Sequence, residues 1–285
     1  MPSPSARESN YAMIERRIPK TNESIPAIGL GTWQVFDVDG VRAVAQARET
    51  LSAFVDGGGR LVDSSPMYGS AESVTGRLAA ELGVHAKLFV ATKVWTTGRQ
   101  AGIRQMTDSL RKLGVERLDL MQVHNLTDVH THLATLSEWK REGRVRYLGI
   151  THYHAGAHAE LASLIEDNDI DFVQVNYSLA EPEADRRVLG VAAARGTAVI
   201  VNRPFAGGAM LRHLQGKALP DWAKEIECAS WSQIALKWIL GHPAVTSVIP
   251  ATRSAAHAVE NLNAGTGSLP GERLRRRIAE EWAAR

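Results

Sequence analysis

The chain has 285 residues, of which 44% are hydrophobic and 22% charged, so it can bury a large apolar core. Lys and Arg number 33 against 31 Asp and Glu, and the basic residues are scattered apart from a short run near the C-terminus, which gives no indication of a nucleic-acid partner. The polar residues 1–12 lack a secretory apolar core, and no later run reaches the roughly 18 apolar residues of a membrane helix. We therefore expect a cytoplasmic protein with a mobile N-terminal tail over residues 1–12 and no membrane partner.

Taken in chain order, short β-rich segments alternate with longer segments whose apolar residues recur every three or four positions. Residues 13–27 hold two short apolar stretches around a polar turn and predict a β-hairpin. The predicted strands that follow are 27–35, 60–65, 88–94, 118–124, 147–153, 172–178, 198–204 and 246–252. The predicted helices are 40–58, 71–83, 103–114, 132–143, 156–168, 184–196, 221–243, 254–264 and a final amphipathic helix at 271–285.

Eight strand–helix units with nearly continuous apolar strands indicate an α/β fold in which a parallel sheet closes into a (β/α)8 TIM barrel. A single barrel domain over residues 13–285 accounts for the length, with the N-terminal β-hairpin closing the bottom and an extra C-terminal helix outside. An open doubly wound sheet is the competing architecture. It would carry a Gly-x-Gly-x-x-Gly turn after the first strand, whereas here Gly29 and Gly31 stand without the third glycine.

Polar side chains end several of the predicted strands, at the end of the barrel where active sites lie. Asp63, Lys93, His124 and Thr151 end four consecutive strands, with spacings of 30, 31 and 27 residues. This spacing corresponds to one strand–helix unit per step. We therefore expect these groups side by side on one rim.

Lys93 lies in an apolar strand, where an unpaired ammonium group would be strongly disfavoured. Asp63 on the neighbouring strand is its expected counter-ion, and Tyr68, in the Pro/Gly loop that follows, can hydrogen-bond to the ammonium. A nearby cation lowers the pKa of a phenol below its usual value of about 10. We therefore expect Tyr68 to act as a general acid near neutral pH.

The residues together resemble the aldo-keto reductase family, over nearly the whole chain, through the segments IGLGTW, LVDSS, PMYGSAE, TKVW, LMQVH, GITHY, VQVNYSL and IPATRSAAHAVENL. The resemblance implies an NAD(P)H-dependent oxidoreductase that reduces aldehydes or ketones to alcohols by hydride transfer. In such an enzyme Tyr68 would protonate the developing alkoxide, and Lys93 with Asp63 would tune it. His124 would orient the carbonyl group, so the implied catalytic residues are Asp63, Tyr68, Lys93 and His124.

The same resemblance implies where the cofactor lies. The residues it assigns, from the nicotinamide to the adenosine end, are Thr32, Trp33, Thr151, His152, Gln174, Asn202, Arg203, Phe205, Gly207, Thr252, Arg253, Ser254, His257, Glu260 and Asn261. Among them, Thr151, His152 and Gln174 would hold the carboxamide. The adenosine end would lie at the start of a helix, whose dipole suits phosphate. Trp33 and Trp95 would wall an apolar substrate pocket.

The chain departs from the usual family pattern at several of these positions. His152 stands where an asparagine is usual, and Asn202 stands where an aromatic ring commonly stacks on the nicotinamide. Many members carry a lysine at Ala251 and an arginine at His257 for the 2'-phosphate, so Arg253 remains as the nearby cation. We expect NADPH as cofactor, with NADH as the alternative. The pocket should be open, since only about 24 residues follow Asn261.

Two functions of other classes remain open at this point. A regulatory barrel that binds the nucleotide with little turnover would share this fold, as the potassium-channel beta subunits of the family do. A metal-dependent hydrolase would use Asp63, His124 and His152 as ligands. We expect a small-molecule carbonyl substrate, no metal and a monomer.

Overall fold

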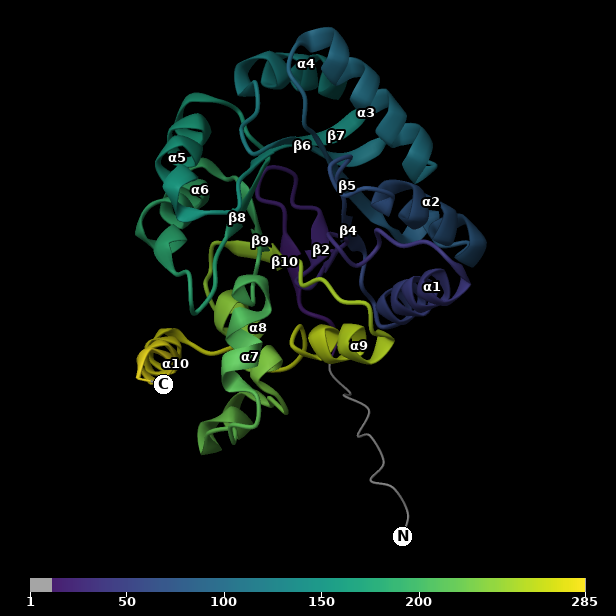
Figure 1. Ribbon diagram of the computed structural model, residues 1–285. Helices are drawn as coiled ribbons and strands as arrows, with labels where there is room; N and C mark the ends of the chain where they lie inside the picture. The colour runs from purple at the N-terminus through teal and green to yellow at the C-terminus, as the bar shows by residue number, and fades with distance from the viewer. Residues whose placement is uncertain (1–11, 285) are drawn as a thin grey trace.

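A parallel sheet of eight strands forms a ring with helices outside it in the computed structural model, which describes residues 12–284 (Figure 1). Each strand pairs in parallel with the next along the chain: β3 (Leu30–Gly31), β4 (Leu61–Asp63), β5 (Phe89–Val94), β6 (Leu118–His124), β7 (Val145–Thr151), β8 (Phe172–Asn176), β9 (Ala198–Asn202) and β10 (Val245–Val248). Parallel bridges between Ile28 and Val248, and between Gly31 and Ala251, join the first strand to the last. The predicted (β/α)8 barrel is therefore confirmed.

The helices surround the ring and follow the strands in alternation (Figure 1). They are α1 (Val41–Asp56), α2 (Ala71–Leu82), α3 (Arg99–Leu113), α4 (Val129–Arg141), α5 (His158–Asp167), α6 (Val188–Arg195), α7 (Ala209–Leu214), α8 (Trp231–Leu240), α9 (Ala255–Asn263) and α10 (Glu272–Ala283). Left-handed Gly83, Gly114 and Gly196 cap the ends of α2, α3 and α6, as glycine does where a side chain would be strained. The helix α10 lies outside the ring, as the sequence predicts.

An antiparallel hairpin of β1 (Glu15–Arg17) and β2 (Ser24–Pro26) lies within the ring in Figure 1 and fills one end of the barrel. Its Ile18 and Ile25 have no exposed surface and join the apolar cluster inside the barrel. The hydroxyl of Tyr147 in β7 donates to a carboxylate oxygen of Glu23 at 2.6 Å. The predicted hairpin thus closes the end of the barrel opposite the strand ends that carry the site.

Side chains along each strand alternate between the barrel interior and the layer under the helices. In β6, Leu120 belongs to the interior cluster, whereas Met121 packs in the outer core with the helices. Toward the C-terminal end the interior positions become polar, at Gln122 and then His124. This change from apolar to polar layers places the candidate site on a rigid apolar base.

Three predicted elements differ from the structure. The strand expected at 27–35 is reduced to Leu30–Gly31 and two bridges, because the chain turns at Thr32. The helix α7 falls in a stretch to which the sequence assigned no element. The helix expected at 221–243 is broken into a 3-10 helix, Asp221–Ile226, and α8, since the side chain of Ser230 accepts the amide of Gln233 and starts a new helix.

The predicted tail, residues 1–12, lies outside the described residues except for Ala12, so the division into a tail and a single domain stays a prediction. No helix within residues 12–284 is long and apolar enough to cross a membrane.

We expect Gly76→Ala to lower the free energy of unfolding by about 3 kcal/mol, because a Cβ at Gly76 would lie 2.2 Å from the backbone oxygen of Lys112, where α2 meets α3. The matched control is Gly190→Ala in α6, whose Cβ would meet nothing within 4 Å. Its higher helix propensity should raise stability by about 0.5–1 kcal/mol. Urea unfolding of both variants checks this, and equal midpoints would contradict the close approach of α2 and α3.

Candidate active site

Asp63 and Lys93 form a buried ion pair at the C-terminal ends of β4 and β5. The Lys93 Nζ donates to Asp63 Oδ2 at 2.6 Å and to the Ser64 carbonyl oxygen at 2.7 Å. The side chains of Lys93 and Asp63 are 0% and 3% exposed. Burial by itself lowers the pKa of Lys93, but the charge of Asp63 and the contact with Tyr68 outweigh burial, so the pKa is raised above its usual value. Lys93 therefore stays charged at neutral pH.

Tyr68 lies in the loop between β4 and α2, and its ring centroid is 4.8 Å from the Lys93 Nζ. Burial raises the pKa of Tyr68 above its usual value of 10, and the charge and hydrogen bond of Lys93 only partly oppose it. The expectation of a lowered pKa is therefore wrong, because the loss of water around the phenol outweighs the nearby cation. Tyr68 consequently holds its proton throughout the neutral range.

His124 ends β6 and lies against Tyr68. The two rings meet edge to face, with centroids 5.8 Å apart, and the His124 Nδ1 pairs with the Ser65 hydroxyl at 3.0 Å. Burial and then the charges of Lys93 and His152 lower the pKa of His124 to about 3. The imidazole is therefore neutral near pH 7. The structure brings together all four side chains assigned to catalysis, and their catalytic roles stay a prediction.

A buried glutamine that the sequence did not single out completes the surroundings of Asp63. Gln122 in β6 donates from its Nε2 to Asp63 Oδ1 at 3.0 Å, and Gln174 in β8 donates to the same oxygen at 2.9 Å. Gln122 precedes His124 by two positions, so the alternation of the strand points both side chains into the barrel. That spacing is the signal that could have identified it.

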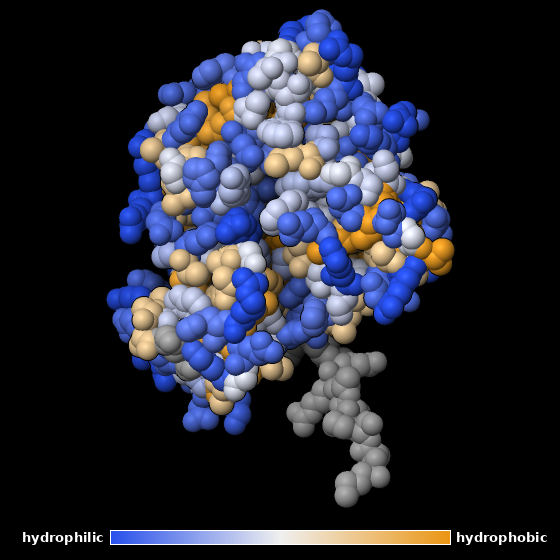
Figure 2. Space-filling view, viewed as in Figure 1, coloured by the Kyte–Doolittle hydropathy of each residue, from blue (hydrophilic) through white to orange (hydrophobic). Residues whose placement is uncertain are grey.

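A cavity of about 930 Å³ opens beside Tyr68 and His124. Figure 2 shows this face of the molecule hollowed toward the middle. The sequence-predicted site residues that line the cavity are Thr32, Trp33, Asp63, Tyr68, His124, Thr151, Gln174, Asn202, Arg203, Phe205, Gly207, Thr252, His257, Glu260 and Asn261. Those that do not are Lys93, Trp95, His152, Arg253 and Ser254.

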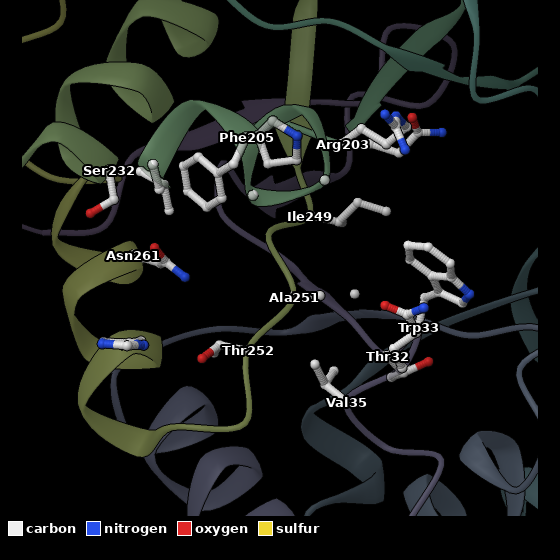
Figure 3. Close-up of a pocket in the computed structure, with 18 of the residues that line it drawn as sticks. Thr32, Trp33, Val35, Arg203, Phe205, Ser232, Ile249, Ala251, Thr252 and Asn261 are labelled. Carbon is white, nitrogen blue, oxygen red and sulfur yellow. The ribbon is translucent and has the colours of Figure 1, made fainter. Parts of the chain in front are cut away.

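The cavity is long and has two chemically different ends (Figure 3). Thr32, Trp33 and Arg203 lie toward one side, whereas Ser232 and Asn261, from α8 and α9, lie toward the other. Ile249 and Ala251 lie between them. The elongated shape suits a ligand with two separated recognition groups better than a compact one.

Gln174 connects the polar groups at the reacting end. Its Oε1 accepts from the Thr151 hydroxyl at 3.2 Å and from the Asn202 amide at 3.3 Å. The His152 Nδ1 instead accepts the backbone amide of Tyr153 at 2.9 Å, and the two rings stack. The structure places Tyr153, and not His152, in the cavity wall. A role for His152 in holding a carboxamide stays a prediction without a contact to support it.

The cations around the cavity differ from those expected. Arg253 donates to the Gln34 carbonyl oxygen at 2.5 Å and does not line the cavity, whereas His257 and Lys217 do. Arg203 adopts a left-handed backbone, φ 50°, and donates to Glu181 at 3.2 Å. The sequence offered no signal for Lys217, because it lies in the stretch left without a predicted element.

Two polar atoms of cavity-lining residues lack partners among the described residues: the Nε of Arg203 and the Oδ1 of Asn202. The cavity thus offers amide groups at one end, a guanidinium group along it, and the N-terminus of α9 at the other end. These donors fit a nicotinamide dinucleotide, which presents a carboxamide, phosphates and an adenosine. The residues present are therefore compatible with the cofactor that the sequence implies.

Large apolar side chains are exposed at the mouth of the cavity. Trp33, Met67 and Tyr153 line it and are 46%, 43% and 50% exposed. Trp95 is 42% exposed, and its ring lies 6.5 Å from that of His124. Exposed apolar groups around a pocket are typical of a ligand-binding surface.

The metal-dependent alternative finds no support in the contacts. Within the part of the chain that the structure describes, no three His, Cys, Asp or Glu side chains gather in a way that could hold an ion. Asp63 is engaged by Lys93, Gln122 and Gln174, and His124 is paired with Ser65.

Comparisons with known proteins agree with this geometry. The sequence profile described as "Aldo/keto reductase family" matches residues 27–276. Methylglyoxal reductase YeaE of Escherichia coli (strain K12) is 29% identical over 245 residues, which cover 84% of each chain. An aldo-keto reductase of Mycobacterium sp. (strain KMS) is 33% identical over 201 residues, 67% of each chain. An aldo-keto reductase from Klebsiella pneumoniae, solved in complex with NADPH, has a TM-score of 0.77 and 25% identity, and the match covers 94% of this chain and 96% of that one.

Proposed function

The chain belongs to the aldo/keto reductase family, and from this membership we propose that it is an NADPH-dependent reductase of small aldehydes and ketones with Tyr68 as the proton donor. One observation carries the proposal: Tyr68 lines the cavity while resting against the buried Lys93–Asp63 pair. A polarised phenol beside a ligand cavity is suited to proton donation.

The bound cofactor supplies a hydride to the carbonyl carbon of the substrate. Tyr68 donates its hydroxyl proton to the carbonyl oxygen, which becomes the alcohol oxygen. Lys93 stabilises the phenolate that remains, because its ammonium lies against the Tyr68 ring and Asp63 holds it in place. The neutral His124 offers a polar contact to the same oxygen without adding a charge that would compete with Lys93.

The relatives support both cofactor and substrate class. The Klebsiella pneumoniae structure contains NADPH, and the Escherichia coli relative is named a methylglyoxal reductase. Arg203, Lys217 and, when protonated, His257 supply positive charge to the cavity wall for phosphate groups. The apolar rim would hold the non-reacting part of the aldehyde.

We expect the purified chain to consume NADPH, more efficiently than NADH, in the presence of methylglyoxal or a small aromatic aldehyde. The measurement is the loss of the absorbance of the reduced nicotinamide at fixed cofactor over a panel of aldehydes and ketones. A thermal-shift titration with each cofactor serves as the parallel measurement of binding. Protection against unfolding by NADPH without consumption for any carbonyl compound would overturn the proposal and favour the regulatory barrel.

A further inference from the structure

We infer that Gln122 is a positioning residue that joins the proton-donating side of the cavity to the side that receives the nicotinamide. The inference rests on the proposed function, and it goes beyond it in assigning a role to a side chain that does not line the cavity. Gln122 has no exposed surface. Its partners are the two residues that face the proposed reactants from either side.

The contacts of Gln122 form one connected network. Its Nε2 donates to Asp63 Oδ1 at 3.0 Å, and its Oε1 accepts from the Gln174 Nε2 at 3.2 Å. Gln174 also donates to Asp63 Oδ1 at 2.9 Å. The three side chains therefore close a triangle in which Asp63 is fixed by Lys93 at one oxygen and by two amides at the other.

The barrel leaves space for this arrangement. Gln122 is opposite Lys93 on β5 and opposite Gly149 on β7. A Cβ at Gly149 would lie 3.1 Å from the Gln122 Cγ and 2.9 Å from the Phe172 carbonyl oxygen. The absence of a side chain at Gly149 thus allows the longer Gln122 to cross the interior.

The network has a definite consequence for the site. Gln174 faces the cavity, and its own Nε2 is shared between Asp63 and Gln122. Its Oε1 is held by Thr151 and Asn202, so every polar atom of the Gln174 amide has a fixed direction. Removing Gln122 frees Gln174 to rotate and leaves Asp63 with one donor fewer, and both changes disturb the geometry on which cofactor binding depends.

The test compares Gln122→Met with Gln122→Glu, using binding of NADP⁺ followed by quenching of tryptophan fluorescence. Gln122→Met keeps the shape and loses both hydrogen bonds, so it should weaken NADP⁺ binding about tenfold at all pH values. In Gln122→Glu, burial beside Asp63 raises the pKa of the introduced carboxyl group. When protonated, that group donates to Asp63 and accepts from Gln174, as the amide does.

Binding to Gln122→Glu should therefore be more than about tenfold weaker than to the wild type near pH 9 and recover to within about threefold near pH 6. Each affinity is divided by that of the wild type at the same pH, which cancels the titration of Asp63, Lys93, Tyr68, His124 and His257. Met121→Leu, on the outward face of the same strand, is the control and should bind NADP⁺ as the wild type does.

A purely structural role would lower the thermal midpoint of both variants without any pH-dependent recovery, and that result would overturn the inference. Equal affinity in the wild type and both Gln122 variants would overturn it as well. Failure of the wild type itself to bind NADP⁺ would instead overturn the proposed function, so the two failures are distinguishable.

Discussion

Tyr68→Phe is expected to slow carbonyl reduction about 10³-fold while leaving the affinity for NADPH within about twofold. The substitution removes only the hydroxyl that donates the proton, and the ring keeps its contacts with Lys93 and His124. Lys93 and its hydrogen bonds to Asp63 and Ser64 remain in place. The measurements are steady-state turnover with a saturating aldehyde and cofactor binding by fluorescence.

The pH dependence of the wild type tests the same assignment. A proton donor is active below its pKa and is lost as the pH rises through it. Because burial raises the pKa of Tyr68 above 10, the reduction rate should stay level across the neutral range and fall only above about pH 10. A fall between about pH 7 and 9 would show that Lys93 dominates over burial.

Tyr153→Phe is the matched control for Tyr68→Phe, because Tyr153 also lines the cavity and loses the same hydroxyl. It has no contact with Lys93, so its turnover should remain within about twofold of the wild type. Equal losses in both variants would show that neither hydroxyl is specific to proton transfer.

The sequence predicts the barrel and much of the site, because the relevant signals are local and periodic. Asp63, Lys93 and His124 stand at the ends of apolar strands about thirty residues apart, and parallel strands carry such positions to one rim. Tyr68 is predictable for a similar reason, since its loop directly follows Asp63. Each prediction needed only the strand period and the order of the units.

What the sequence missed depends on competition between groups in three dimensions. The pKa of Tyr68 reflects the balance of burial against Lys93, and a sequence shows the cation but not the loss of water. The direction of His152 depends on its backbone turn, which pairs the imidazole with the next amide. The break before α8 is an exception, since Ser230 and Gln233 form a capping pattern that the continuous apolar period concealed.

Lys93→Met is expected to abolish reduction and to lower the free energy of unfolding by about 3–5 kcal/mol. The stability loss arises because Asp63 would remain buried with its charge facing only the amides of Gln122 and Gln174. The loss of activity arises because no cation would then stabilise the phenolate of Tyr68. Urea unfolding and turnover with NADPH measure the two effects separately.

The double variant Lys93→Met with Asp63→Asn separates these causes. The introduced amide carries no charge, so the second substitution removes the uncompensated carboxylate and should recover about half or more of the lost stability. Activity should stay absent, because the cation beside Tyr68 is still missing. The deficit of the single variant should also shrink at acidic pH, where the Asp63 carboxyl group can be buried in its protonated form. Full activity in a stably folded double variant would contradict the role of Lys93, and an unchanged stability in the single variant would contradict the buried ion pair.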